Sequence, residues 1–143
     1  MTVKPYERKA HFYETDQMGI IHHANYIHWF EEARVDFMEQ IGFGYEKSVE
    51  SGVDIAVLEV KCTYKAMVRF NDRVHVHLYI KELTPIRMVI GYKITDAADG
   101  GLRTTGESMH CFLDTKEHKL LRLDRTLPDL YDLFGTYTET KKA

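Results

Sequence analysis

One stretch of the sequence repeats its apolar residues at spacings of three and four, and it constrains the fold more than any other feature. The stretch begins at Ala24 and ends before Gly42, a residue well placed to stop a helix. Its apolar members form one broad helical face: they are Tyr26, Ile27, Phe30, Ala33, Phe37, Met38 and Ile41. A single helix that is apolar along one stripe needs a sheet to cover that stripe.

Apolar residues outside this helix alternate along the chain, which is typical of half-buried β-strands. Pro128 suits the first turn of a short helix over residues 129–134, capped by Thr126. The charged tail, residues 135–143, is expected to be frayed. Strands are expected at residues 6–13, 56–64, 74–80, 88–94 and around 109–113, separated by turn residues at Asn71-Asp72, Pro85 and Asp99-Gly100-Gly101.

This order of elements predicts an α+β fold in which a five- or six-stranded antiparallel sheet wraps around one long central helix. The 143 residues are enough for one domain with a real core, so residues 1–143 are expected to form a single domain. Open edge strands and the uncovered face of such a sheet favour the formation of a dimer.

Charge and composition exclude several classes of protein. The chain has 19 lysine and arginine residues against 22 acidic ones, a net charge of −3, which argues against a nucleic-acid binder that relies on a broad basic field. Cys62 and Cys111 form no CxxC pair and are expected to be free thiols in a reducing compartment. No apolar run is long enough to span a bilayer, and residues 1–16 lack a signal-peptide stretch. We therefore expect a cytoplasmic protein that binds neither nucleic acid nor membrane.

The densest group of chemically active residues lies just before the helix. Asp16 stands in a polar turn that ends at Gly19, and the free N–H groups of the helix start point back toward this turn. A carboxylate beside a helix start that stabilises an oxyanion is the minimum set for hydrolysis of an activated acyl group. On residue type alone, an aspartate before a helix is more often a cap or turn residue, so both readings stay open at this point.

The run ETDQMGIIHHANYIHWFEEAR resembles the signature of the 4-hydroxybenzoyl-CoA thioesterase superfamily, in its YbgC-like acyl-CoA thioester hydrolase branch. That signature reads D-T-D-x-x-G-V-V-Y-H-A-N-Y followed by F-E-x-A-R. Further matches at Tyr64, Asp72 and residues 105–112 extend the resemblance from about residue 6 to 123. The matching positions in the first block are Asp16, Gly19, His23, Asn25, Tyr26, Phe30, Glu31, Ala33 and Arg34.

The resemblance implies a hotdog fold, hydrolysis of an acyl-CoA thioester to free acid and coenzyme A, and no cofactor beyond the coenzyme A of the substrate. It also implies a homodimer or homotetramer whose pocket forms between two subunits. Asp16 matches the catalytic carboxylate, which acts as nucleophile or as general base. His23 matches the catalytic position whose backbone N–H polarises the thioester carbonyl.

Substrate-binding positions carried over from the resemblance are Gly19, which would let the loop approach the ligand, and Asn25. Two departures from the signature occur: Glu14 replaces an aspartate and keeps its charge, and His22 replaces a tyrosine, which leaves open which imidazole contacts substrate. Arg87 is a candidate for the coenzyme A phosphates, because these need cationic partners; Lys65 and Arg69 are further candidates.

Alternatives remain at the level of the sequence. The pairs His22-His23 and His75-x-His77 suggest a metal site, but no carboxylate or cysteine completes a familiar ligand spacing, so no metal is expected. A non-catalytic acyl-CoA binding or regulatory module is possible on the same fold, although the intact block from Asp16 to Asn25 argues against it. An acyl-ACP thioesterase is the second alternative, and a hotdog dehydratase lacks support because its acid and histidine are placed differently.

Overall fold

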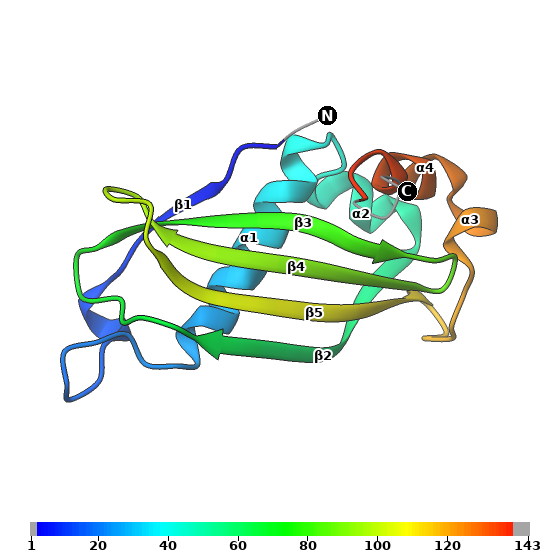
Figure 1. The fold of residues 1–143 in the computed structure, drawn as a ribbon. Helices are drawn as coiled ribbons and strands as arrows, with labels where there is room; N and C mark the ends of the chain where they lie inside the picture. The colour runs from blue at the N-terminus through cyan, green and yellow to red at the C-terminus, as the bar shows by residue number, and fades with distance from the viewer. Residues whose placement is uncertain (1–2, 139–143) are drawn as a thin grey trace.

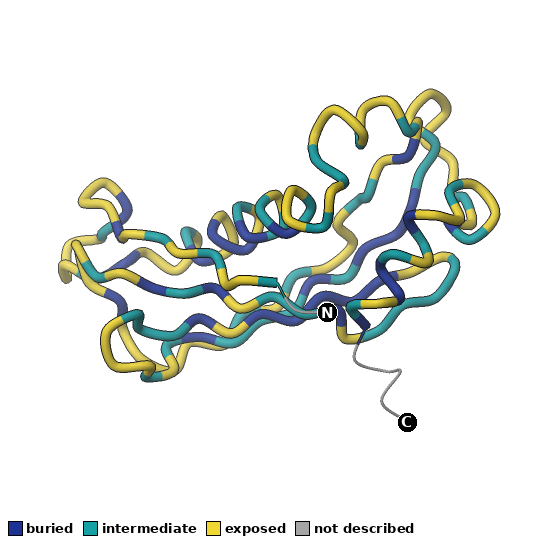
Figure 2. The backbone as a smooth tube through the Cα atoms, turned by 90° about the horizontal axis from the view of Figure 1, so that it is seen from above, coloured by how far each residue is buried: buried dark blue, intermediate teal, exposed yellow. Residues whose placement is uncertain are grey.

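Residues 3–138 are described by the structure, a computed structural model. One long helix, α1 (Asn25–Gln40), lies against a five-stranded antiparallel sheet (Figures 1 and 2). The sheet has the order β1-β3-β4-β5-β2, so β1 and β2 are its edges. Its strands are β1 (Tyr6–Lys9), β2 (Val53–Tyr64), β3 (Arg73–Leu83), β4 (Arg87–Asp96) and β5 (Leu102–Asp114). The α+β prediction is confirmed.

Packing of α1 on the sheet forms the core. Trp29 and Phe30 are completely buried, and the Phe30 ring stacks on Tyr92 of β4 with centroids 4.2 Å apart. The predicted helical face is confirmed with one exception, because Ile27 is exposed. Irregular registers in β2 and β3 add local twist to these strands, which helps the sheet to curl around the helix.

Close approach of helix and sheet depends on Gly106 of β5. A Cβ atom at this position would lie 2.5 Å from the ring of Phe30. Because Phe30 is itself held by the Tyr92 ring, it has little room to move away. The absence of a side chain at Gly106 therefore sets how deeply Phe30 enters the core.

The first strand is shorter than predicted. It ends at Lys9, and the chain then turns through a short 3₁₀ helix, η1 (Phe12–Glu14). The strand stops because the backbone of Ala10 pairs with the turn at Asn71 and Asp72 rather than with β3. A second helix, α2 (Tyr45–Ser51), was not predicted; it contributes no buried residue and so leaves no apolar stripe in the sequence.

Two short helices, α3 (Leu123–Thr126) and α4 (Pro128–Thr136), follow the sheet. Pro128 begins α4 as predicted, but the predicted cap at Thr126 is wrong, since Thr126 ends α3 and Leu127 caps α4. The chain stays ordered past residue 135, because Phe134 is buried and Thr138 pairs with Ile80 of β3. The rest of the expected tail, residues 139–143, lies outside the described residues. Across residues 3–138, no helix is both long and apolar enough to cross a membrane.

We predict that Gly106→Ala lowers the free energy of unfolding by about 1–3 kcal/mol, because the added methyl group overpacks the core against Phe30. Urea unfolding followed by the fluorescence of Trp29 measures the change. The matched control is Gly44→Ala, just before α2. Its added methyl group meets the carboxylate end of the exposed Glu39 side chain, which can move into solvent, so the expected loss is smaller. Equal losses in the two variants would contradict the role given to Gly106.

Candidate active site

A buried carboxylate, Glu14, organises the region that contains the predicted catalytic residues. Its side chain is 3% exposed and accepts hydrogen bonds from the Nε1 of Trp29 at 2.8 Å and from the backbone of His11 at 2.9 Å. The guanidinium of Arg8 donates to both carboxylate oxygens at 3.0 Å. Four N–H groups from β1, η1 and α1 therefore converge on one buried charge, as a buried charge requires.

Arg8 extends this network to a second carboxylate on α1. Its Nε donates to Glu32 at 2.8 Å, and the hydroxyl of Tyr6 donates to the same oxygen at 2.9 Å. Burial, and then the bond to Glu32, raise the pKa of Tyr6 to about 12. The Arg8 guanidinium also lies 5.6 Å from the ring centroid of Trp29, within range of a cation–π contact. Strand β1 is thus fixed to the first half of α1.

Asp16 stands in a tight turn two residues after Glu14. Its backbone N–H donates to Ile20 at 2.9 Å, and its carbonyl accepts the N–H of Gly19 at 3.0 Å. One carboxylate oxygen accepts the N–H of Met18 at 2.8 Å, while the side chain as a whole is exposed. Gly19 has a φ of +77°, and a Cβ there would meet no atom within 4 Å. The glycine is thus required by backbone conformation, whereas its predicted approach to a ligand stays a prediction.

The start of α1 is tied to the same loop. The backbone carbonyl of Glu14 accepts the N–H of His22 at 2.8 Å and the side-chain amide of Asn25 at 2.9 Å. Asn25, predicted to bind substrate, therefore uses its amide to hold the helix start against the loop. A substrate contact for Asn25 stays a prediction.

The two adjacent histidines have different surroundings. The Nδ1 of His22 accepts the N–H of Ala24 at 3.2 Å, and the His22 and His23 rings stack with centroids 4.1 Å apart. The backbone N–H of His23 donates a hydrogen bond to none of the residues that the structure describes. His22 therefore supports the local backbone, while His23 presents a free donor at the start of the helix.

Asp16 and His23 line the same cavity, which has a volume of about 490 Å³. Lys65, another predicted candidate, lines it as well, whereas His22, Gly19 and Asn25 are not among its lining residues. Residues that carry a carboxylate, a free backbone N–H and a cation thus line one cavity. The full lining is Asp16, Ile20, Ile21, His23, Tyr26, Tyr64, Lys65, Ala66 and Met67.

Tyr64, the last residue of β2, is a site residue for which no role is predicted from the sequence. Its hydroxyl donates to the backbone carbonyl of His23 at 2.9 Å, and its ring contacts Tyr26 with centroids 5.1 Å apart. Burial raises the pKa of Tyr64 above its ordinary value. The only signal in the sequence was that the family resemblance continues through this position, because strand periodicity explains the tyrosine equally well.

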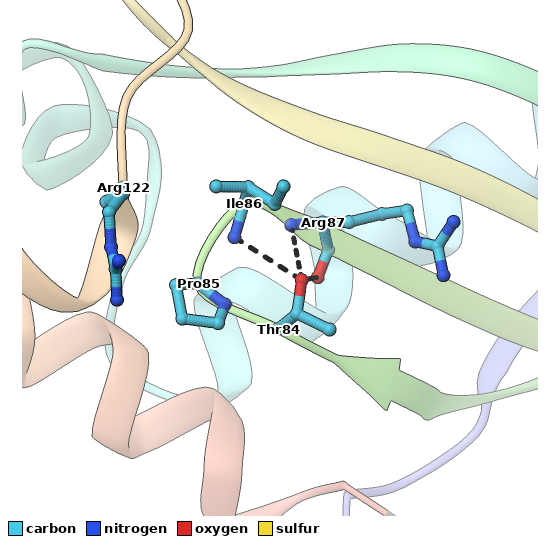
Figure 3. Close-up of a pocket in the computed structure, with 5 residues that line it drawn as sticks. All are labelled: Thr84, Pro85, Ile86, Arg87 and Arg122. Carbon is cyan, nitrogen blue, oxygen red and sulfur yellow. Dashed lines mark hydrogen bonds between the residues drawn. The ribbon is translucent and has the colours of Figure 1, made fainter.

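Within one subunit, Arg87 lies far in space from the cavity at Asp16. It borders a second cavity of about 430 Å³ at the turn between β3 and β4, where its guanidinium donates to Glu82 at 2.6 Å. Figure 3 shows the guanidinium groups of Arg87 and Arg122 on opposite sides of this turn. Arg87 is aligned through β5 with Ala56, eight residues before Tyr64 on β2, or roughly 26 Å at the usual rise of a strand. One chain therefore does not bring Arg87 to Asp16.

The histidines of β3 have partners outside the cavity. His75 lies 3.1 Å from a carboxylate oxygen of Glu7, and His77 lies 3.1 Å from the hydroxyl of Thr95. Burial, followed by the nearby His75, lowers the pKa of His77. Within residues 3–138, no three histidine, cysteine, aspartate or glutamate side chains gather as a metal ion would require.

Comparison with known proteins gives a consistent result. Residues 10–131 match the thioesterase-like superfamily. The chain is 31% identical, over 99% of its length and all of the relative's, to YneP of Bacillus subtilis, named as a candidate acyl-CoA thioesterase. It is 22% identical to the acyl-CoA thioester hydrolase YbgC of Escherichia coli, over 62% of this chain and 66% of that protein. The structure of DHNA-CoA thioesterase from Staphylococcus aureus superposes with a TM-score of 0.86 at 32% identity, over 93% of this chain and 89% of that one.

We predict that Glu14→Gln lowers the free energy of unfolding by about 2–4 kcal/mol, because Arg8 loses its most buried anion. Urea unfolding of the two proteins gives the difference. Glu59→Gln is the matched control: its carboxylate is half exposed and lies 3.9 Å from Lys61, so a change below about 0.5 kcal/mol is expected. A Glu14→Gln loss no larger than that of the control would contradict the anchoring role.

Proposed function

The chain belongs to the thioesterase-like superfamily, and we propose that it hydrolyses acyl-CoA thioesters to a free acid and coenzyme A in the Asp16 cavity. It has the hotdog fold and is a thioesterase. The observation that carries the proposed reaction is that Asp16 and His23 line the same cavity, and that no described residue accepts the His23 N–H. The acyl-CoA substrates named for YneP and YbgC support the choice of thioester.

The start of α1 polarises the thioester carbonyl. The carbonyl oxygen accepts a hydrogen bond from the N–H of His23, which no described residue occupies. The positive end of the α1 dipole lies at this position and stabilises the negative charge that develops on the oxygen. The donor is fixed before substrate arrives, so little reorganisation is needed during the reaction.

Asp16 supplies the second part of the reaction by one of two routes. As a general base, its carboxylate takes a proton from water while the water oxygen attacks the carbonyl carbon. As a nucleophile, it forms a mixed anhydride that water then hydrolyses. In both routes the carbon–sulfur bond breaks, and the coenzyme A thiolate leaves with the electron pair. These steps use protein groups and water alone, so we propose that no cofactor or metal takes part.

A second copy of the chain completes the site in this proposal, by pairing along the edge of β2. This strand has 12 residues against four in β1, the other edge. It presents Val57 and Leu58, which are 48% and 57% exposed, and β5 is its one neighbouring strand among the described residues. Such an edge favours pairing with another strand. A closed homodimer results if two copies of β2 pair antiparallel about a two-fold axis.

This dimer also explains how Arg87 can serve the site. Antiparallel pairing sets the Tyr64 end of one β2 opposite the Val53 end of the other. Arg87 of the partner subunit then lies three strand spacings from the Tyr64 end, one across the β2 pair and two within the partner's sheet, or about 14 Å at ordinary strand spacing. An extended ligand held at Asp16 reaches this distance. We therefore propose that Arg87 of the partner subunit binds a phosphate of coenzyme A, as a charge-assisted contact.

We predict that Asp16→Asn lowers the release of free thiol from acyl-CoA esters by about a hundredfold or more, since the variant keeps the shape of the side chain and loses its charge. The assay uses short, long and aromatic acyl-CoA esters with EDTA present, and circular dichroism checks the fold. Asp132→Asn, exposed on α4 and outside the cavity, is the matched control and should keep full activity.

Other outcomes of this assay would indicate a different function or a different catalytic residue. A fully active Asp16→Asn variant would remove the residue from the mechanism. Wild-type protein that binds the esters and releases no thiol would favour the non-catalytic binding module. Turnover of acyl-ACP alone would favour the acyl-ACP thioesterase.

We predict that Arg87→Ala raises the KM for acyl-CoA esters about three- to tenfold and changes kcat less than twofold, as expected for the loss of one phosphate contact. Acyl-N-acetylcysteamine esters, which lack the nucleotide phosphates, should keep their KM. Arg73→Ala is the matched control, because Arg73 is exposed and pairs with Glu7 on β1. An equal rise in KM for both kinds of ester would refute the phosphate contact.

A further inference from the structure

Tyr64, at the sheet edge, contacts the backbone of His23. Among the described residues, its hydroxyl is the sheet-edge group that bonds to the His23 carbonyl. Its backbone is fixed as the last residue of β2, in register with Thr104 of β5. The residue lines the cavity, and its hydroxyl donates to the carbonyl of His23 at 2.9 Å. The ring contacts Tyr26 and lies edge-on to the imidazole of His23, with centroids 6.4 Å apart.

The two peptide groups on either side of the His23 Cα are held by different parts of the molecule. The preceding group contains the His23 N–H and the carbonyl of His22, and that carbonyl accepts the N–H of Asn25 at 3.0 Å. The following group contains the carbonyl of His23, which Tyr64 holds. With both groups fixed, the φ and ψ angles of His23 have little freedom, and its N–H keeps one direction.

We propose that Tyr64 is a positioning residue for the reaction, because its hydroxyl fixes the direction in which the His23 N–H meets the thioester carbonyl. This inference rests on the proposed function and adds a residue to it. The hydroxyl suits the task, since it stays protonated and therefore a donor across the pH range of a thioesterase assay. A residue on the β2 edge thereby links the strand that forms the proposed dimer to the donor at the start of α1.

Tyr64→Phe tests the inference, because phenylalanine keeps the ring contacts and removes only the hydroxyl. We expect kcat to fall about tenfold, with KM changed less than twofold, as for one hydrogen bond that acts in the transition state. A larger loss, of a hundredfold or more, is expected only when an oxyanion donor itself is removed. Tyr45→Phe makes the same chemical change on exposed α2 and should leave both constants unchanged.

A spectroscopic readout separates positioning from a general structural role. The infrared stretch of ¹³C-carbonyl-labelled benzoyl-CoA bound to the Asp16→Asn variant reports how strongly the carbonyl is polarised. We expect a smaller shift to low frequency in the Asp16→Asn/Tyr64→Phe double variant. Thermal unfolding checks that both proteins remain folded under the conditions of the measurement.

Different results would overturn the role of Tyr64 and the proposed hydrolysis. An unchanged carbonyl frequency in the double variant would overturn the role of Tyr64, as would a Tyr64→Phe enzyme with wild-type kcat or with a raised KM alone. Absence of turnover by the wild type, or full activity of Asp16→Asn, would overturn the proposed function. In the first case the carbonyl frequency of the bound ester, and in the second case the kcat of Tyr64→Phe, would still decide whether Tyr64 orients the His23 donor.

Discussion

The buried carboxylate of Glu14 is the interaction on which the rest of the site depends. A charge with 3% exposure is tolerated only when donors surround it, and here they come from β1, η1 and α1. The backbone of the same residue holds His22 and Asn25 through its carbonyl. One residue therefore fixes the position of the Asp16 turn and the start of α1 together, which is the relation that hydrolysis of a thioester needs.

The buried Glu14 holds the backbone in place, and this allows Asp16 and His23 to be exposed. Asp16 and His23 are exposed, yet neither lies on a loose loop. The turn at Asp16 is closed by its own backbone hydrogen bonds, and His23 lies between the Glu14 anchor and Tyr64 of the sheet edge. The two groups proposed for catalysis are thereby supported from two sides by rigid elements, which keeps their geometry without burying them.

Local patterns in the sequence predicted α1, the four longer strands and the α+β class, because each depends on residues close together in the chain. The Asp16 and His23 pair came from a family signature confined to the same short segment. Long-range contacts left no comparable pattern: Glu14 meets Trp29 fifteen residues later, and Tyr64 meets His23 across 41. Glu14 was therefore interpreted as a modest replacement for aspartate, when it is the anchor of the site.

The limits of one chain also explain why acyl-group preference does not follow from the sequence. The cavity at Asp16 is open, and the long β2 edge beside it carries exposed Val57 and Leu58. If a second copy pairs with that edge, its residues form the remaining wall of the cavity, and the relative placement of two curled sheets sets the depth available to an acyl group. In the proposed reaction one chain supplies Asp16 and His23, while the fit between the two copies of the proposed dimer defines which acyl group is accepted.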